Sequence, residues 1–150
     1  MIQFEEVKRI KEQNIQSKIP ERSTKNAAGY DFFSVEEVEI QPNEIKYVKT
    51  GIKAKFPDDM CLLLLNRSSN PKKKGLVLAN GVGLVDADYY ENEDNDGEIA
   101  FAFQNITNEV VKININDKLG QGVFTKFFVT DSDDVTDERK GGFGSTDKKE

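Results

Sequence analysis

Histidine is absent from this chain of 150 residues, and cysteine occurs only once. The lack of histidine excludes histidine-dependent catalytic triads and histidine metal sites, and it removes the usual general base. Acid–base chemistry therefore falls to carboxylates, lysine, tyrosine and hydroxyl groups. The single cysteine, Cys61, cannot form an intrachain disulfide, which fits a reducing compartment. Because it precedes four leucines, we expect its thiol to be buried.

Long apolar stretches and an excess of positive charge are also missing. No apolar run approaches the length of about 18 residues that a membrane span needs, and the first residues lack the apolar core of a secretory signal. We therefore expect a cytoplasmic protein without membrane contact. The 21 basic residues are outnumbered by 27 acidic ones, and the net charge of −6 would repel a nucleic-acid backbone. Direct nucleic-acid binding is not expected, although a local site can still attract a free nucleotide.

Inward and outward positions alternate along three segments, which is the pattern of half-buried β-strands. The inward positions are Val48, Thr50, Ile52, Ala54 and Phe56 in the first segment, Ile99, Phe101 and Phe103 in the second, and Val111, Ile113 and Ile115 in the third. Residues 61–65 form a continuous apolar run, which predicts a strand covered on both faces. Residues 121–129 are also strand-like because they include three phenylalanines.

Many short strands separated by turn residues predict an all-β sandwich or barrel. No helical stripe of useful length competes with this interpretation. Residues 5–13 fit either a helix or a strand, and a short helix is expected after Ser69. Residues 78–83 are interpreted as a hairpin whose glycines let the backbone approach a ligand closely.

One compact domain accounts for the length, since a chain of this size buries about 68–70% of its unfolded surface in a single core. We assign residues 1–130 to this β-domain. From Asp131 the chain becomes polar and acidic and then rich in glycine, so residues 131–150 are expected to form a mobile arm. Another acidic stretch, residues 91–97, is interpreted as a solvated loop, with an ion or partner site as the alternative.

The densest group of candidate functional residues lies between Asn66 and Tyr89. It holds an arginine with two serines, three consecutive lysines, a glycine-flanked turn, an isolated carboxylate and an aromatic ring. Such groups can bind a triphosphate and activate water. Together with residues 27–31 (AAGYD), 117–121 (DKLGQ) and 139–146 (RKGGFGST), this block resembles the five ordered motifs of the deoxyuridine triphosphatase (dUTPase) family.

The resemblance implies a jelly-roll-like β-barrel that forms a homotrimer with active sites shared between subunits. The implied activity is magnesium-dependent hydrolysis of dUTP to dUMP and pyrophosphate, which limits uracil in DNA and supplies dUMP. The long acidic loop at residues 91–97 resembles the variant common in bacterial and phage members. For a phage protein the expected location is the cytoplasm of the host.

The resemblance also assigns roles within the block. Asp86 is the expected general base, which accepts a proton from the attacking water. Tyr89 is expected to pack against the deoxyribose and leave no room for a 2′-hydroxyl. Asn80, with Gly81 and Val85 in the same segment, is expected to bind uracil, because an amide and backbone groups match the edge of this base and penalise cytosine.

Phosphate contacts are expected from Arg67, Ser68, Ser69 and Gln121, since a guanidinium fork and hydroxyl donors suit phosphate oxygens. Asp31 matches the family carboxylate that helps to hold nucleotide-bound Mg²⁺ through water. Lys118 stands where arginine is usual, which keeps the charge but loses the planar fork. Asn66 stands where glycine or proline is usual, so the resemblance leaves the backbone geometry of that turn open.

The glycine-rich end supplies the last group of expected contacts. By resemblance Phe143 would stack over uracil, followed by Gly144 in the same lid, while Arg139, Ser145 and Thr146 would contact the γ-phosphate as the arm closes. Arg139 precedes Phe143 by one residue fewer than is usual in the family. This run lacks the Gly-Lys-Ser/Thr of a P-loop and follows no βα unit.

Two other functions are compatible with the sequence. A dCTP deaminase on the related fold would need a carboxylate that activates water at the cytosine ring, and it usually lacks the glycine-rich arm. A regulatory dUTP-binding protein, as proposed for some phage members, would use nucleotide occupancy to order the arm and control a partner protein. The acidic loop at residues 91–96 is the feature that favours the regulatory alternative.

Overall fold

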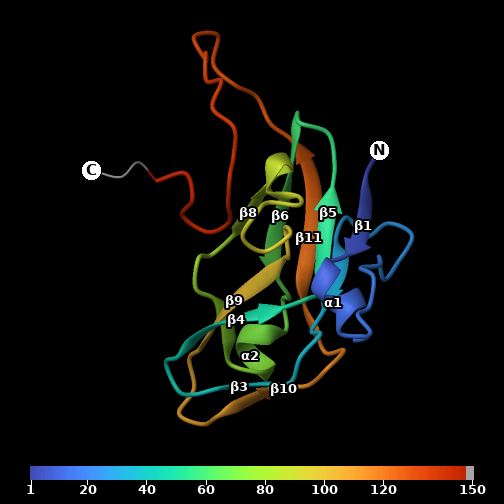
Figure 1. Cartoon of the computed structure of the whole chain (residues 1–150). Coiled ribbons are helices and arrows are strands. Elements are labelled where there is room, and N and C mark those ends of the chain that lie inside the picture. The colour runs from blue at the N-terminus through green and yellow to red at the C-terminus, as the bar shows by residue number, and fades with distance from the viewer. Residues whose placement is uncertain (148–150) are drawn as a thin grey trace.

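The computed structural model describes residues 1–147, and its regular structure is mainly antiparallel β-sheet (Figure 1). The strands are β1 Gln3–Glu6, β2 Tyr30–Phe33, β3 Val38–Ile40, β4 Ile45–Lys49, β5 Ile52–Lys55, β6 Met60–Asn66, β7 Leu76–Leu78, β8 Gly83–Asp86, β9 Ala100–Asn105, β10 Val111–Ile113 and β11 Lys118–Lys126. The helical elements are α1 Lys8–Glu12, α2 Asn70–Lys73 and the 3-10 turn η1 Ala87–Tyr89. Within residues 1–147, none of the helices has the length and apolar character to cross a membrane.

The strands form separate sheets rather than one continuous closed sheet. A four-stranded sheet has the order β2-β11-β6-β8 and a three-stranded sheet the order β4-β9-β7, while β1 pairs with β5 and β10 with β3. Figure 1 shows β6 and β11 side by side along the length of the molecule, with β4 and β9 crossing them. This arrangement is all-β and jelly-roll-like, as the sequence predicts.

The core lies between the two larger sheets. Phe32 of β2 meets Phe101 of β9 with ring centroids 5.7 Å apart, and Phe101 stacks on Phe103 at 6.1 Å. Other members of the same cluster are Val48, Ile52, Leu62, Leu76, Ile99, Ile113 and Leu119. Because full burial of one such side chain contributes about 1.5–3 kcal/mol, this cluster fixes the positions of the strand ends.

The first alternating segment is confirmed with one interruption and one exception. Its expected inward positions are all buried, but Gly51 adopts a positive φ of 72° and divides the segment into β4 and β5. Lys53, expected on the solvent face, is only 3% exposed. Its ammonium group is neutralised by Glu91 at 2.7 Å and Asp96 at 3.2 Å, which makes burial of the charge tolerable.

The other strand predictions hold in part. The third segment ends at Ile113, so Ile115 is exposed, and β11 ends at Lys126, so that Phe128 is 93% exposed. In β6 the thiol of Cys61 is buried as predicted, whereas Leu63 and Leu65 are only half-buried in the single chain. The prediction that β6 is covered on both faces therefore holds for only one face of the single chain, and Ile115 does not belong to its core.

The amino-terminal ambiguity is resolved by a strand followed by a helix, β1 and then α1, and the short helix expected after Ser69 is α2. Residues 131–147 contain no helix or strand. In Figure 1 this segment continues beyond the end of β11, turns back and passes beside β8. Residues 148–150, the last part of the predicted arm, lie outside the described residues.

Candidate active site

Asp86 is the last residue of β8, and the strand ladder determines where its side chain begins. β8 pairs with β6 from Cys61↔Asp86 to Leu64↔Gly83, and η1 starts at the next residue. Since neighbours in a strand point to opposite faces, Val85 is buried and the side chain of Asp86 remains 49% exposed. A carboxylate held in this way can take a proton from a water molecule beside a bound ligand.

Tyr89 lies at the end of η1, and its hydroxyl group is held from two sides. The hydroxyl donates to the Glu98 carbonyl at 2.8 Å and accepts from the Asn95 amide at 2.8 Å. Burial raises the pKa of Tyr89, so the phenol stays protonated and keeps its role as a donor. The carboxylate of Glu98 is itself held by Arg9 at 2.6 and 2.5 Å. The aromatic ring therefore has a fixed place beside the cavity.

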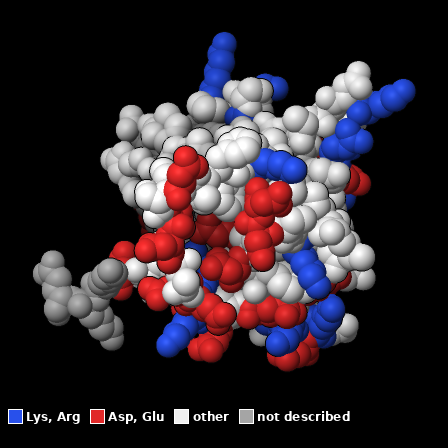
Figure 2. All heavy atoms as spheres, turned by 90° about the horizontal axis from the view of Figure 1, so that it is seen from above, with Lys and Arg blue, Asp and Glu red and all other residues white. Residues whose placement is uncertain are grey.

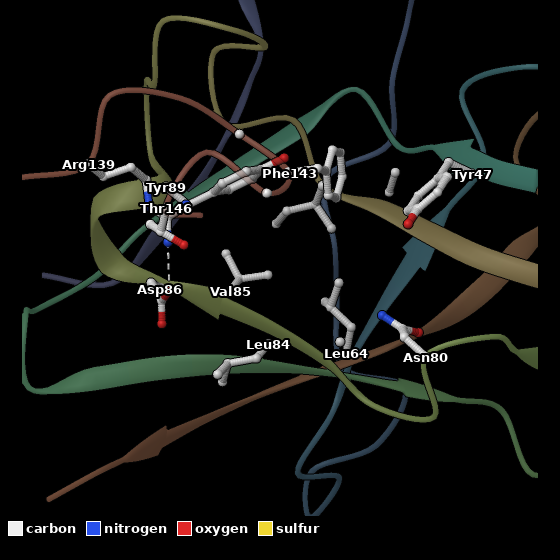
Figure 3. Close-up of a pocket in the computed structure, with 15 residues that line it drawn as sticks. Tyr47, Leu64, Asn80, Leu84, Val85, Asp86, Tyr89, Arg139, Phe143 and Thr146 are labelled. Atoms are coloured by element: carbon white, nitrogen blue, oxygen red, sulfur yellow. Dashed lines mark hydrogen bonds and ion pairs between the residues drawn. The ribbon is translucent and has the colours of Figure 1, made fainter. Parts of the chain in front are cut away.

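A cavity of about 280 Å³ lies next to Asp86 and Tyr89. Figure 3 shows Asp86 and Asn80 at opposite ends of it, with Leu64, Leu84 and Val85 between them. The volume is close to the small end of typical ligand pockets, and an apolar middle with polar ends is typical of sites for small molecules.

Asn80 and Gly81 form the turn between β7 and β8. The interpretation of residues 78–83 as a hairpin is wrong, because β7 pairs with β9 and β8 pairs with β6, so the turn connects two sheets. The turn is closed by the Gly81 N–H donating to the Leu78 carbonyl at 3.0 Å. Its place between the sheets puts the Asn80 amide at one end of the cavity.

Residues of the arm also line the cavity. The ring of Phe143 lies between Tyr47 and Tyr89, with ring centroids 5.1 and 6.2 Å away, and Gly144 and Thr146 also line the cavity (Figure 3). Ser145 closes a turn within the arm, since its hydroxyl donates to the Gly141 carbonyl at 2.9 Å. The phenylalanine is still 66% exposed, which leaves its ring available to a ligand.

Arg139 binds the carboxylate that the sequence singles out. Its guanidinium donates to Asp86 at 2.8 Å and to Asp88 at 2.8 Å. Burial alone would lower the pKa of Arg139, but the two carboxylates raise it overall, so the cation is retained. Figure 2, in which the molecule is seen from above, shows acidic side chains gathered on the face turned to the viewer.

The residues predicted to bind phosphate follow β6, at the end of this strand that lies away from Asp86. Ser69 precedes α2, while Arg67 and Ser68 form the turn before it. Asn66 supports this turn: its side-chain oxygen accepts from the Arg67 N–H at 2.9 Å and from the Asn70 amide at 2.8 Å. Asn66 thus supplies by hydrogen bonds what glycine or proline would supply by backbone preference.

Asp31 and Gln121 lie at the same end of the four-stranded sheet as this turn. Gln121 is the register partner of both Asp31 in β2 and Leu65 in β6. Lys118 forms an ion pair with Asp31 at 3.1 Å. The strand order thus brings together a carboxylate, an amide and two cationic residues, which suits a metal-bound phosphate chain.

Within one chain, the residues predicted to bind phosphate lie far from Asp86. Asp86 stands opposite Cys61, and the phosphate turn follows Asn66, so five residue steps of β6 intervene. At about 3.3 Å a step this is roughly 17 Å. The structure therefore brings Asn80, Gly81, Val85, Asp86, Tyr89 and the arm residues together, and it groups Arg67, Ser68, Ser69, Gln121 and Asp31 elsewhere.

Sequence reasoning missed Tyr47, Asp94 and Asn95. Tyr47 lies on the outward face of β4 and is still in contact with Phe143. An aromatic ring at an outward strand position is a usable signal, because such positions are normally polar. Asn95 donates to the hydroxyl of Tyr89, and Asp94 accepts the N–H of Gly142 in the arm. Both contacts depend on the shape of a loop and have no periodic signal.

Comparisons with known proteins agree with this geometry. A family model described as dUTPase matches residues 16–147. The deoxyuridine 5'-triphosphate nucleotidohydrolase of Lactococcus lactis subsp. lactis is 47% identical over 145 residues, which cover 95% of this chain and 95% of that protein.

Solved structures give the same result. The dUTPase from Streptococcus mutans superposes with a TM-score of 0.81 at 41% identity, covering 87% of this chain and 99% of that one. The dUTPase from phage phi11 of S. aureus superposes with a TM-score of 0.72 over 91% of this chain and 97% of that one. At 24% identity this second likeness concerns the fold alone.

Proposed function

Because the chain belongs to the dUTPase family and hydrolyses dUTP, we propose that Asp86 activates the water that attacks the α-phosphorus. The water oxygen forms the new bond to phosphorus, and the bond from this phosphorus to the α,β-bridging oxygen breaks. Asp86 takes the proton of the water, and pyrophosphate leaves with the bridging oxygen. The observation that supports this proposal is the position of Asp86 at the end of the cavity, fixed by the β6–β8 ladder.

The same cavity accounts for selection of the nucleoside. We assign uracil to the end at Asn80, where an amide and the open turn at Gly81 offer hydrogen-bond partners to the base. The ring of Tyr89, held through its hydroxyl, stands beside the sugar and would collide with a 2′-hydroxyl. Val85 lines the space between base and reacting phosphate.

The phosphate-binding residues are proposed to come from a neighbouring subunit of a homotrimer. Arg67, Ser68 and Ser69 follow the end of β6 that lies away from Asp86, and Gln121 of β11 pairs with Leu65 near the same end. These residues are too far away to surround phosphates that also meet Asp86 of the same chain. Surface apolar side chains support assembly: Leu84 beside the cavity is 63% exposed, and Phe128 after β11 is almost fully exposed. Association of chains would bury them and complete the site.

Subunit sharing is tested by mixing two inactive variants. After subunit exchange between Arg67→Ala and Asp86→Asn trimers, some sites would combine an intact Arg67 from one chain with an intact Asp86 from another. We expect activity above the sum of the separate variants. No gain, despite mixed trimers detected by native mass spectrometry, would contradict a shared site.

Mg²⁺ fits the residues at the phosphate end. This ion prefers phosphate oxygens, water and one or two carboxylates, so a single, largely buried carboxylate such as Asp31 suits water-mediated contact. When bound, the ion would neutralise charge on the triphosphate and orient it. Lys118, which pairs with Asp31, would remain close enough to share that role.

The arm is proposed to close over the bound nucleotide. Phe143 already lies beside Tyr89 and would stack on uracil, while Gly144, Ser145 and Thr146 follow it towards the phosphates. Arg139 is proposed to exchange Asp86 for the γ-phosphate on nucleotide binding. This exchange would release the carboxylate for its reaction with water.

Neither alternative from the sequence is favoured by these contacts. Among the described residues Asp86 is the one carboxylate that lines the cavity, and it lies away from the Asn80 end, so a carboxylate to activate water at a cytosine ring is not in place there. Phage 80alpha dUTPases are described as controlling transfer of virulence genes, but at 20–21% identity they share with this chain only the fold. A regulatory partner and a cytoplasmic location remain proposals.

One experiment tests reaction and position of attack together. The protein is incubated with dUTP, dCTP, UTP or dTTP in ¹⁸O-water with Mg²⁺, and the products are identified by mass spectrometry. We expect dUTP alone to react rapidly and the heavy oxygen to appear in dUMP. Label in pyrophosphate would contradict attack on the α-phosphorus.

A further inference from the structure

The acidic loop of residues 91–97, which we call the 91–97 loop, is fixed to the β-domain at both ends. Lys53, buried in β5, donates to Glu91 at 2.7 Å and to Asp96 at 3.2 Å. Asp96 also accepts the N–H of Lys8 at the start of α1, at 2.8 Å. Two of its carboxylates are therefore committed to holding the loop in place.

Hydrogen bonds inside the 91–97 loop determine its shape. Asn92 is buried, and its amide donates to the Tyr89 carbonyl at 2.8 Å and to Asn95 at 2.7 Å. The Asn92 side-chain oxygen accepts the N–H of Asp94 at 3.0 Å. Asn95 then reaches the hydroxyl of Tyr89, so the loop is continuous with the wall of the cavity.

The outer side of the loop meets the arm directly. The N–H of Gly142 donates to the Asp94 carboxylate at 2.7 Å, and the N–H of Glu93 donates to the Lys140 carbonyl at 3.3 Å. A Cβ atom at Gly141 would lie 2.3 Å from the Asp94 carboxylate. The two glycines therefore let the backbone of the arm approach the loop at hydrogen-bond distance.

We infer that the 91–97 loop is the docking surface of the arm and that Asp94 is a positioning residue for the hydrolysis of dUTP. Asp94 holds Gly142, and the next residue is Phe143, so this bond sets where the ring lies between Tyr47 and Tyr89. The inference rests on the proposed closure of the arm over the nucleotide. The occupant of the acidic loop is then the arm of this protein, either from the same chain or from another subunit of an oligomer.

Trypsin measures docking without any need for turnover. Cleavage after Arg139 or Lys140 removes Phe143, and it requires the arm to leave the loop. With Mg²⁺ and the non-hydrolysable analogue α,β-imido-dUTP present, Asp94→Ala should be cleaved about tenfold faster than the parent protein, because one hydrogen bond to a charged acceptor is lost. Asp94→Asn, which keeps an acceptor oxygen, should fall between them.

Glu93→Ala is the matched control. Glu93 is the neighbouring exposed carboxylate, its substitution changes the net charge equally, and it meets the arm through its backbone N–H. Its cleavage rate should remain that of the parent protein. Equal cleavage of Asp94→Ala and Glu93→Ala would overturn the assignment of Asp94.

A double-mutant cycle tests the close approach of the arm. Gly141→Ala should weaken docking because its methyl group meets the Asp94 carboxylate, and in an Asp94→Ala background the same change should have little further effect. Additive effects would place the cost of Gly141→Ala elsewhere. Across the series, kcat/KM for dUTP should fall as the cleavage rate rises, at an unchanged midpoint of thermal unfolding.

Closure of the arm and docking of the arm on the 91–97 loop are contradicted by different results. If removal of residues 139–150 leaves kcat unchanged, closure of the arm is not part of the reaction. If that removal lowers kcat while Asp94→Ala matches the parent protein in both cleavage and kcat/KM, closure stands and the loop is not its dock.

Discussion

The β-domain and the arm are held by different kinds of contact. The strands enclose a continuous cluster of aromatic and aliphatic side chains, many of them fully buried. Residues 139–147 are attached through a few polar bonds, chiefly Arg139 to Asp86 and Asp88 and Gly142 to Asp94. Apolar burial fixes a group permanently, whereas isolated surface bonds of this kind can break and re-form. The base and the wall of the site therefore belong to the fixed part, and the lid to the exchangeable part.

Two phenylalanines make this contrast measurable. Phe103 in β9 is 0% exposed and Phe143 in the arm is 66% exposed. Phe103→Ala should lower the free energy of unfolding by about 3–5 kcal/mol, because it leaves a cavity in the core. Phe143→Ala should change it by less than about 0.5 kcal/mol but should lower kcat/KM for dUTP. Urea unfolding monitored by circular dichroism measures the first quantity, and a large loss of stability in Phe143→Ala would break the contrast.

Asp86→Asn tests whether the fixed part carries the chemistry. We expect kcat to fall at least about a hundredfold with fold and nucleotide binding retained, since this is the low end of general-base effects. Asp88→Asn is the control, because this neighbour also binds Arg139 but does not line the cavity. Near-normal turnover by a folded Asp86→Asn protein would remove this carboxylate from the mechanism.

Truncation after Glu138 tests the exchangeable part. The strands all lie upstream, so the midpoint of thermal unfolding should remain unchanged. The open site loses the exclusion of water and the stacking of Phe143, and kcat should fall by about tenfold or more. A lower unfolding midpoint would show that the arm supports the β-domain, contrary to the contacts described above.

The same contrast explains how far the sequence predicts the structure. The period of two identifies the inward residues of β4, β5 and β9 because core packing repeats along a strand. It fails for Lys53, whose burial depends on Glu91 and Asp96 some 40 residues later in the chain. It also cannot show that β7 and β8 belong to different sheets, because the choice of partner strand depends on the whole fold.

The sequence likewise predicts some residues of the candidate site and not others. Ordered motifs identify Asp86, Tyr89 and the arm by resemblance, and the structure brings them around one cavity. Asp94 and Asn95 carry no such signal, since an acidic loop looks equally like a solvated surface. Their contacts follow from the buried Asn92, which folds the loop so that one face meets Tyr89 and the other meets Gly142.

The smallest expected effect concerns the choice of sugar by Tyr89, where the fixed wall and the arm meet. Tyr89→Ala removes the ring that faces the sugar and the contact with Phe143, so the ratio of kcat/KM for dUTP to that for UTP should fall by about tenfold. Tyr89→Phe is the matched control, because it loses the bonds to Glu98 and Asn95 but keeps the ring. Steady-state kinetics with both nucleotides measure the ratio. If the ring excludes ribose by its bulk, Tyr89→Phe should retain the preference for dUTP. Loss of the preference in Tyr89→Phe would instead show that the hydroxyl bonds, and hence the shape of the 91–97 loop, hold the ring against the sugar.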